Sequence, residues 1–94
     1  MITNELRLEI ERELGKRLVA AAPLSAANNA QIYRLGVDGG GSVVAKVASR
    51  GLELEAFMLR YLRSKTALPV PTVFYSNDHV ILMEFVQTDY SADD

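Results

Sequence analysis

The stretch Ser42-Val43-Val44-Ala45-Lys46-Val47 decides the fold that we expect for this chain. Its apolar and β-branched residues are typical of a buried β-strand, but Lys46 interrupts the run. A lysine in such a strand either extends its ammonium group to water from an exposed face or meets a carboxylate and a ligand. A helix-like segment with two acids follows at once, so the sequence offers Lys46 a partner.

That partner is expected on a helix over residues 52–64, which Ser49 can cap. Glu55 lies on the apolar face of this helix, whereas Glu53 lies about 200° around the axis. A carboxylate on an apolar face is destabilising unless it is paired. Two interpretations stay open on the pattern alone: Glu55 pairs with Lys46, or it lies at the edge of the stripe and reaches water. The residues that share the apolar face at helical spacing are Glu55, Met58, Leu59 and Leu62.

The segment before Ser42 predicts a hairpin. Residues 31–37 alternate polar and apolar, which is typical of a half-buried strand. Asp38-Gly39-Gly40-Gly41 then predicts a tight turn, because glycine adopts positive φ at no steric cost. The glycine run lacks the Gly-Lys-Ser/Thr ending of a P-loop, and no helix follows it. Residues 19–24 predict a further short strand, and residues 25–30 predict a turn.

A helix is expected at the start of the chain, over residues 3–18, with Thr3 or Asn4 as its cap. Gly15 weakens its last turn. Four apolar residues recur every four positions and form one stripe: Leu6, Ile10, Leu14 and Leu18. We expect the charged face to be solvated; it carries Glu5, Glu9, Glu11, Arg12 and Glu13.

After the second helix, Leu68-Pro69-Val70-Pro71 is expected to be extended, because each proline fixes its own φ and restricts the residue before it. Residues 72–75 and 79–86 predict two strands around the turn Ser76-Asn77-Asp78. Val80-Ile81-Leu82-Met83 has no polar break, so this strand should be central and covered on both faces.

These elements predict an α+β domain with a sheet of about five antiparallel strands, an N-terminal helix and a second helix. If one helix lies across the sheet, its opposite face is bare. A bare apolar face of several hundred square ångströms is unusual on a monomer, so we expect the chain to form a homo-oligomer.

Composition excludes several classes of function. The 94 residues make one small domain, and the net charge of −2 with scattered Lys and Arg gives no nucleic-acid groove. Without cysteine there are no disulfides, thiolate ligands or cysteine nucleophiles. No apolar stretch approaches a membrane span or a signal-peptide core, so we expect a cytoplasmic protein without membrane contact. His79 is the only histidine and makes a weak metal ligand by itself.

The order of these elements resembles the amino-terminal lobe of aminoglycoside-phosphotransferase-like kinases, and most of all the fructosamine (ketosamine) kinase family. The resemblance runs from about Leu6 to Val86: helix, two strands with a glycine hairpin, Val-Ala-Lys, a helix with a glutamate, Pro-x-Pro, a hairpin, and a strand ending Met83-Glu84-Phe85-Val86. No single motif is specific, but the order and the spacings are.

The resemblance implies a set of ATP-binding residues. Lys46 matches the lysine that holds the phosphates of ATP, and Glu55 matches the helix glutamate that pairs with it. Met83 matches the gatekeeper beside the adenine, and Glu84 to Val86 match the hinge that holds its edge. The nucleotide-covering loop contributes Ser25 and Asn28. The cofactor implied is ATP with magnesium.

Two departures from the family pattern stand out. The loop carries Ala26-Ala27 where the family usually has two glycines, and alanine hinders the approach of phosphates to backbone amides. The family's catalytic His-Gly-Asp loop and its magnesium ligands follow the hinge, so they are expected in a carboxy-terminal lobe beyond Asp94. We therefore divide the chain into a leading helix (1–18), a sheet with the second helix (19–86) and a hinge or tail (87–94), with no catalytic and no metal-binding residue.

Three functions remain open. The chain is the ATP-binding lobe of a small-molecule kinase that phosphorylates a ketosamine, polyol or amine bound largely by the other lobe. Alternatively, it is a dimerising or partner-binding module derived from such a lobe. The third interpretation is an unrelated α+β domain, for which Glu55→Gln changes stability by no more than about 0.5 kcal/mol.

Overall fold

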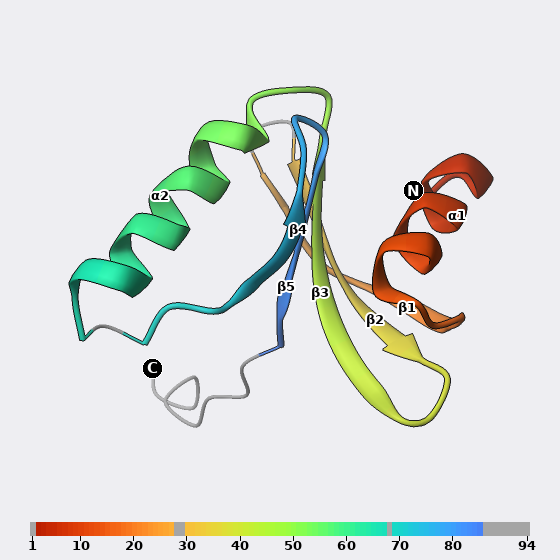
Figure 1. The fold of residues 1–94 in the computed structure, drawn as a ribbon. Helices are drawn as coiled ribbons and strands as arrows, with labels where there is room; N and C mark the ends of the chain where they lie inside the picture. The colour runs from red at the N-terminus through yellow and green to blue at the C-terminus, as the bar shows by residue number, and fades with distance from the viewer. Residues whose placement is uncertain (1, 28–29, 68, 86–94) are drawn as a thin grey trace.

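The computed structural model of the chain describes residues 2–27, 30–67 and 69–85. These residues form a twisted sheet with one helix on each side (Figure 1). The elements in chain order are α1 (Asn4–Leu14), β1 (Leu18–Ala27), β2 (Ala30–Val37), β3 (Gly41–Ala48), α2 (Leu52–Lys65), β4 (Val73–Ser76) and β5 (Val80–Glu84).

The five strands are antiparallel to their neighbours and lie in the order β1-β2-β3-β5-β4. The predicted fold class is therefore confirmed. β5 lies between β3 and β4, and its residues Val80 to Met83 are all buried, as the unbroken apolar run predicted. The glycine hairpin is also confirmed: Gly39 and Gly40 have φ angles of 95° and 94°, and the amide of Gly40 donates to the carbonyl of Val37 at 3.0 Å.

Neither face of the sheet is left wholly bare, so that expectation is wrong. α1 packs against one face through Ile10, which is fully buried, and α2 covers part of the other face (Figure 1). The prediction failed because it counted a single helix as a cover, whereas α1 and α2 lie on opposite faces. The core under α1 consists of Ile10, Leu18, Tyr33, Leu35, Val37, Val43, Ala45, Val80 and Leu82.

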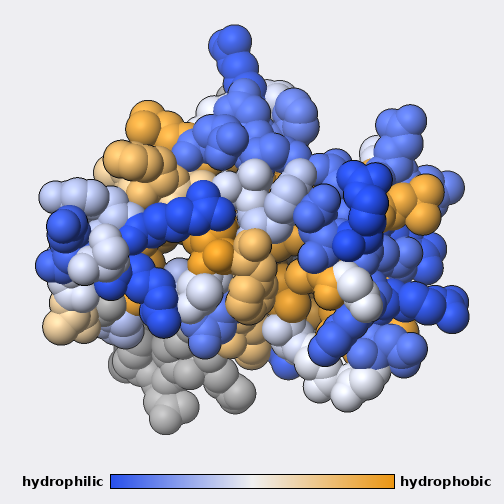
Figure 2. All heavy atoms as spheres, viewed as in Figure 1, coloured by the Kyte–Doolittle hydropathy of each residue, from blue (hydrophilic) through white to orange (hydrophobic). Residues whose placement is uncertain are grey.

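The core under α2 is smaller, and of the four residues predicted on the inner face of the helix, Glu55, Leu59 and Leu62 are partly buried whereas Met58 is not. Leu52 and Ala56 are buried against Ile81 and Met83, with Leu59 partly buried beside them. Met58, which the periodicity assigned to the buried stripe, is 54% exposed. A second apolar stripe faces away from the sheet, and apolar side chains are visible on the outer surface over α2 in Figure 2. We call it the outer stripe; it consists of Leu54, Phe57, Met58 and Tyr61.

The first helix is shorter than predicted. Thr3 caps it, since its hydroxyl oxygen accepts from the amide of Leu6 at 3.1 Å. Gly15 does not merely weaken the last turn but ends the helix, in a left-handed conformation with φ of 71°. Leu18 therefore belongs to β1, where it is buried in the core under α1.

The next strand is longer than predicted, because β1 extends through the residues that were expected to form a turn. Ser25, Ala26 and Ala27 pair with Ile32, Gln31 and Ala30 of β2. Pro23 lies in the edge strand β1 beside a register shift between Pro23 and Ser25, and both edge strands and bulges tolerate proline. Asn28 and Asn29 lie outside the described residues.

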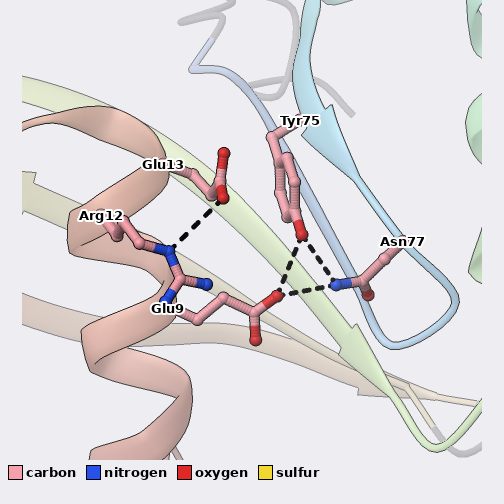
Figure 3. A network of polar contacts seen from close by, with 5 residues as sticks. All are labelled: Glu9, Arg12, Glu13, Tyr75 and Asn77. Atoms are coloured by element: carbon pink, nitrogen blue, oxygen red, sulfur yellow. Dashed lines mark hydrogen bonds and ion pairs between the residues drawn. The ribbon is translucent and has the colours of Figure 1, made fainter.

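The charged face of α1 is not simply solvated, because Glu9 connects α1 to the turn between β4 and β5 (Figure 3). Its carboxylate accepts from the Tyr75 hydroxyl at 3.1 Å and from the Asn77 side-chain amide at 2.7 Å. The other end of the Asn77 side chain accepts from the amides of His79 and Val80, so Asn77 also closes the turn. Glu9 is thereby joined to Tyr75 and Asn77, which lie 66 and 68 positions later in the sequence.

We expect Glu9→Ala to lower the free energy of unfolding by about 1 kcal/mol, because two hydrogen bonds to a half-buried charged acceptor are lost. Urea unfolding followed by circular dichroism measures the change. Glu13→Ala is the matched control, since Glu13 contacts Arg12 at 3.7 Å on the exposed side of the helix. Equal effects of the two substitutions would show that the contact to the turn is not stabilising.

Glu11 makes a second tertiary contact from the same charged face. Its carboxylate accepts from the backbone amide of Leu18 at 2.8 Å and lies 3.3 Å from the Arg7 side chain. The hydrogen bond from Leu18, together with the positive charge of Arg7, holds the pKa of Glu11 below its ordinary value. The carboxylate thus fixes the short connection between α1 and β1.

This shift predicts a pH dependence. A carboxylate with a lower pKa in the folded than in the unfolded state stabilises the fold above the unfolded pKa of about 4.3. That contribution disappears as the pH falls through the folded pKa. The melting temperature of Glu11→Gln should therefore lie below that of the unsubstituted protein at neutral pH, and the two should converge in acid. Glu13→Gln is the control, and a gap for Glu11→Gln that is constant with pH contradicts the assignment.

Candidate polyphosphate site on the α2 face

Lys46 lies in the middle of β3, opposite Ile32 of β2 and Ile81 of β5. Alternation along the strand buries Val43 and Ala45 under α1, so Val44 and Lys46 extend from the other face, toward α2. The fully apolar neighbours on both sides leave the ammonium group no partner within the sheet.

Glu55 of α2 supplies that partner. Lys46 Nζ lies 2.7 Å from one carboxylate oxygen of Glu55 and 2.9 Å from the other. Burial of Leu52 and Ala56 fixes the rotation of α2. Glu55 lies one turn after Leu52 and directly before Ala56, so it flanks the buried side of the helix. Of the two interpretations that the sequence left open, the ion pair is the one observed. The side chains of Lys46 and Glu55 remain 22% and 39% exposed, so a ligand can reach the pair.

The connection from β3 to α2 is held by the turn before β5. Asp78 accepts from the amide of Gly51 through its carboxylate at 2.9 Å and from the amide of Leu52 through its carbonyl at 3.2 Å. The amide of Ala48 donates to the carbonyl of His79 at 3.0 Å. Ser49 was expected to cap α2, but it does not occupy the N-cap position. Gly51 takes the N-cap position, with φ of 90°, and Asp78 replaces the missing side-chain cap.

The ion pair lines a concavity of about 320 Å³ between the sheet and the start of α2. β1 and β2 form one wall, β3 forms the floor, and the β3–α2 connection with the first turn of α2 forms the other wall. Ser25, predicted from the covering loop, lines it from β1. The lining residues are Ser25, Ala30, Ile32, Lys46, Ala48, Arg50, Gly51, Leu52 and Glu55.

Arg50 is a charged lining residue to which the sequence alone assigned no role. A cation beside a glycine N-cap, just after a strand with a lysine, was the available signal. Among the described residues, the charged side chains that line the concavity are two cations, Lys46 and Arg50, and one acid, Glu55. Such a wall favours an anion over a cation.

Met83 and Glu84, which were predicted to lie at the adenine end, belong to β5 and pair with the first half of β3. Met83 is buried and pairs with Val44, on the same face as Lys46 and toward the far end of β3. Glu84 ends β5 opposite Val43, and its carboxylate accepts from the amide of Thr72 at 3.2 Å. Neither residue lines the concavity. The remaining predicted site residues, Val86 and Asn28, lie outside the described part of the chain.

A cation from β2 lies at this end of the sheet. The guanidinium carbon of Arg34 is 4.2 Å from the centroid of the Phe85 ring, and its Nε donates to the Ser42 hydroxyl at 3.2 Å. These contacts join the end of β5 to β2 and β3. Arg34 is therefore engaged with protein groups.

Among residues 2–27, 30–67 and 69–85, no cluster of three or more acidic or histidine side chains is placed to bind a metal ion. Neither of the two described helices is long and apolar enough to cross a membrane.

Comparison with solved structures relates this arrangement to a known architecture. The chain superposes with a TM-score of 0.75 on the crystal structure of a protein described as a "putative fructosamine-3-kinase" from Thermobifida fusca. The chain has the fold of a kinase amino-terminal lobe. The superposition covers 90% of this chain and 32% of the Thermobifida protein, at 22% sequence identity. At that identity the likeness establishes the fold alone.

No protein-family model and no curated protein sequence matches the chain. The chain spans about a third of the length of the Thermobifida protein. The kinase-lobe fold therefore rests on the arrangement of its strands and helices, and the chemistry has to be argued from its own side chains.

Proposed function

We propose that this chain binds the polyphosphate of ATP on the α2 face of its sheet, as the nucleotide-binding lobe of a small-molecule kinase. The observation that carries the proposal is the ion pair between Lys46 and Glu55, with both carboxylate oxygens within 2.9 Å of Nζ, at the wall of a solvent-accessible concavity. A lysine held in this way presents its charge to phosphate oxygens while the glutamate fixes its direction.

The positions along β3 support the same assignment. Glu84 and Met83 pair with Val43 and Val44, and Lys46 follows two residues later on the same face. A strand rises about 3.3 Å per residue, so the gatekeeper position on β5 and the lysine on β3 are about 7 Å apart along the strand direction. In our proposal the adenine lies at the Met83–Glu84 end, and the phosphates lie toward Lys46.

The wider reaction is assigned at the level of chemical class. We propose transfer of the terminal phosphoryl group of ATP to a hydroxyl of a ketosamine or a related small polyol or amine. Magnesium, when bound with the nucleotide, neutralises charge on the phosphates. We assign no described residue to magnesium or to catalysis. The roles of this chain are to bind the nucleotide and to orient its phosphates, with a cytoplasmic location.

Calorimetric titration of the chain with ATP, with and without magnesium, tests the proposal. We expect saturable binding of ATP and none of adenosine, which lacks the phosphates. Glu55→Gln should weaken ATP binding by about tenfold, because the lysine loses its orienting charge. Glu53→Gln is the matched control two residues away, and it should leave the affinity unchanged within about twofold. Absence of saturable binding of ATP contradicts the proposal.

We propose self-association through α2 as a second candidate function. The outer stripe places Leu54, Phe57, Met58 and Tyr61 at i, i+3, i+4 and i+7, each more than half exposed. α2 also carries acids in its first turn and bases in its last turn. An antiparallel pair of α2 helices from two copies therefore buries the apolar stripes and brings opposite charges together.

Sedimentation equilibrium tests this second candidate. We expect the average mass to rise with concentration, and Phe57→Glu to restore the mass of one chain. Leu8→Glu is the control, because Leu8 is 63% exposed on α1, and it should leave association intact. Lys46→Ala should also leave it intact. A monomer mass that is independent of concentration contradicts the candidate.

A further inference from the structure

Resting on the proposed function, we propose that Arg50 contacts the outermost phosphate of the bound polyphosphate and thereby makes the site prefer a triphosphate to a diphosphate. The ligand is a linear polyphosphate. It has two possible sources, a nucleoside triphosphate or inorganic polyphosphate, and the experiment distinguishes them.

Arg50 lines the same concavity as Lys46, on the wall formed by the start of α2. Within the described part of the chain, its side chain has no hydrogen bond or ion pair. Other arginines on this side of the molecule are engaged: Arg34 with Phe85 and Ser42, and Arg60 with the Ser76 hydroxyl at 3.1 Å. Arg50 therefore supplies a positive charge at the concavity that no group of residues 2–27, 30–67 or 69–85 engages.

The backbone around Arg50 is fixed although its side chain is not. Hydrogen bonds from Ala48 and Gly51 to the turn at Asp78 and His79 hold the connection on both sides of Arg50. The positive φ of Gly51 turns the chain into α2 directly after it. The guanidinium group can thus reorient toward a ligand without a loss of backbone structure, so binding requires the ordering of one side chain.

The sequence of positions along β3 assigns Arg50 to the end of the polyphosphate. Val43 and Val44 lie at the Met83–Glu84 end, Lys46 lies next, and Arg50 follows the end of the strand at Ala48. A nucleotide with its base at the first end passes its inner phosphates by Lys46 before it reaches Arg50. Only a longer phosphate tail extends to the second cation.

The two cations differ in what they offer. The ammonium group of Lys46 is shared with Glu55, so its charge is partly neutralised before the ligand binds. A guanidinium group is planar, stays charged and binds two phosphate oxygens at once. A terminal phosphate has more free oxygens than an internal one, and it is the better match for this geometry.

The test is the ratio of ATP affinity to ADP affinity, measured by calorimetry with the 94-residue chain and its variants. We expect Arg50→Gln to weaken ATP binding by about five- to tenfold and ADP binding by less than twofold, for a solvent-accessible charged contact. Arg50→Lys should give an intermediate ratio, because lysine keeps the positive charge but cannot bind two phosphate oxygens with a planar guanidinium group. Arg17→Gln is the matched control, since Arg17 lines a different surface region with Asp38. Circular dichroism establishes that each variant is folded.

The outcomes separate this inference from the proposed function. If ATP binds and Arg50→Gln weakens ATP and ADP equally or not at all, the inference is wrong and the nucleotide site stands. If ATP does not bind, both fail. Inorganic tripolyphosphate and pyrophosphate form the second arm. If tripolyphosphate binds as tightly as ATP and shows the same dependence on Arg50, the phosphate contact is upheld while the proposed nucleotide function is contradicted.

Discussion

Replacement of Lys46 by alanine is expected to weaken ATP binding by about 10- to 100-fold, which is the loss of one or two charge-assisted hydrogen bonds. The same substitution should change the free energy of unfolding by less than about 1 kcal/mol. The pair with Glu55 is partly exposed, and the freed carboxylate can be hydrated. Calorimetry and urea unfolding measure the two quantities on one protein preparation.

The split between binding and stability is the informative part of this result. A lysine that only stabilises the fold would lose stability and leave ligand affinity unchanged. Lys16→Ala is the control, because Lys16 is exposed beside α1 and does not line the concavity at Lys46. Equal ATP affinity for Lys46→Ala and the unsubstituted chain would contradict the assignment of the site.

Replacement of Leu82 by alanine is expected to lower the free energy of unfolding by about 2–5 kcal/mol. Leu82 is fully buried in the central strand β5, in the core under α1. The substitution removes apolar contacts and leaves a cavity between α1 and the sheet. Because small domains are stable by only about 5–15 kcal/mol, this one change should remove a large share of the total.

Urea unfolding followed by circular dichroism measures this effect, with Leu8→Ala as the matched control. Leu8 lies on α1 with 63% of its surface exposed, so its truncation should change stability by no more than about 0.5 kcal/mol. Similar losses for the two leucines would show that β5 is not the centre of the core.

Elements with strong local signals were predicted correctly. The alternation of residues 31–37, the glycine turn and the unbroken run in β5 each follow from local backbone and packing preferences, and the structure has all three. The ends of two elements were predicted wrongly. Gly15 ends α1 through its left-handed conformation, and β1 continues past Ser25 by pairing with β2.

The errors in packing have one cause. Periodicity on α2 fits two apolar stripes, one with Leu52 and Ala56 and one with Leu54, Phe57 and Met58. Which stripe is buried depends on the sheet, and the small Ala56 allows the closer approach. In the same way, the contact from Glu9 to Asn77 joins segments 68 residues apart, which no local pattern indicates.

For the candidate site, the central pair was predictable and its surroundings were not. A lysine in an apolar strand and a glutamate on an apolar helical face each require a partner, and the tight connection leaves them within reach of one another. Arg50 carries no such requirement, because an exposed arginine is satisfied by water. Its relation to Lys46 follows only from the way that Gly51 and Asp78 turn the chain into α2.

The most direct test of the nucleotide site is a titration of the ¹⁵N-labelled chain with ATP, followed by amide chemical shifts. We predict that the largest shifts fall on the α2 face of the sheet, at Ser25, Lys46 and Arg50 to Leu52, with smaller shifts at Met83 and Glu84. Amides of α1 should stay unchanged. Shifts confined to α1 and its side of the sheet, or no shifts at saturating ATP, would contradict the account.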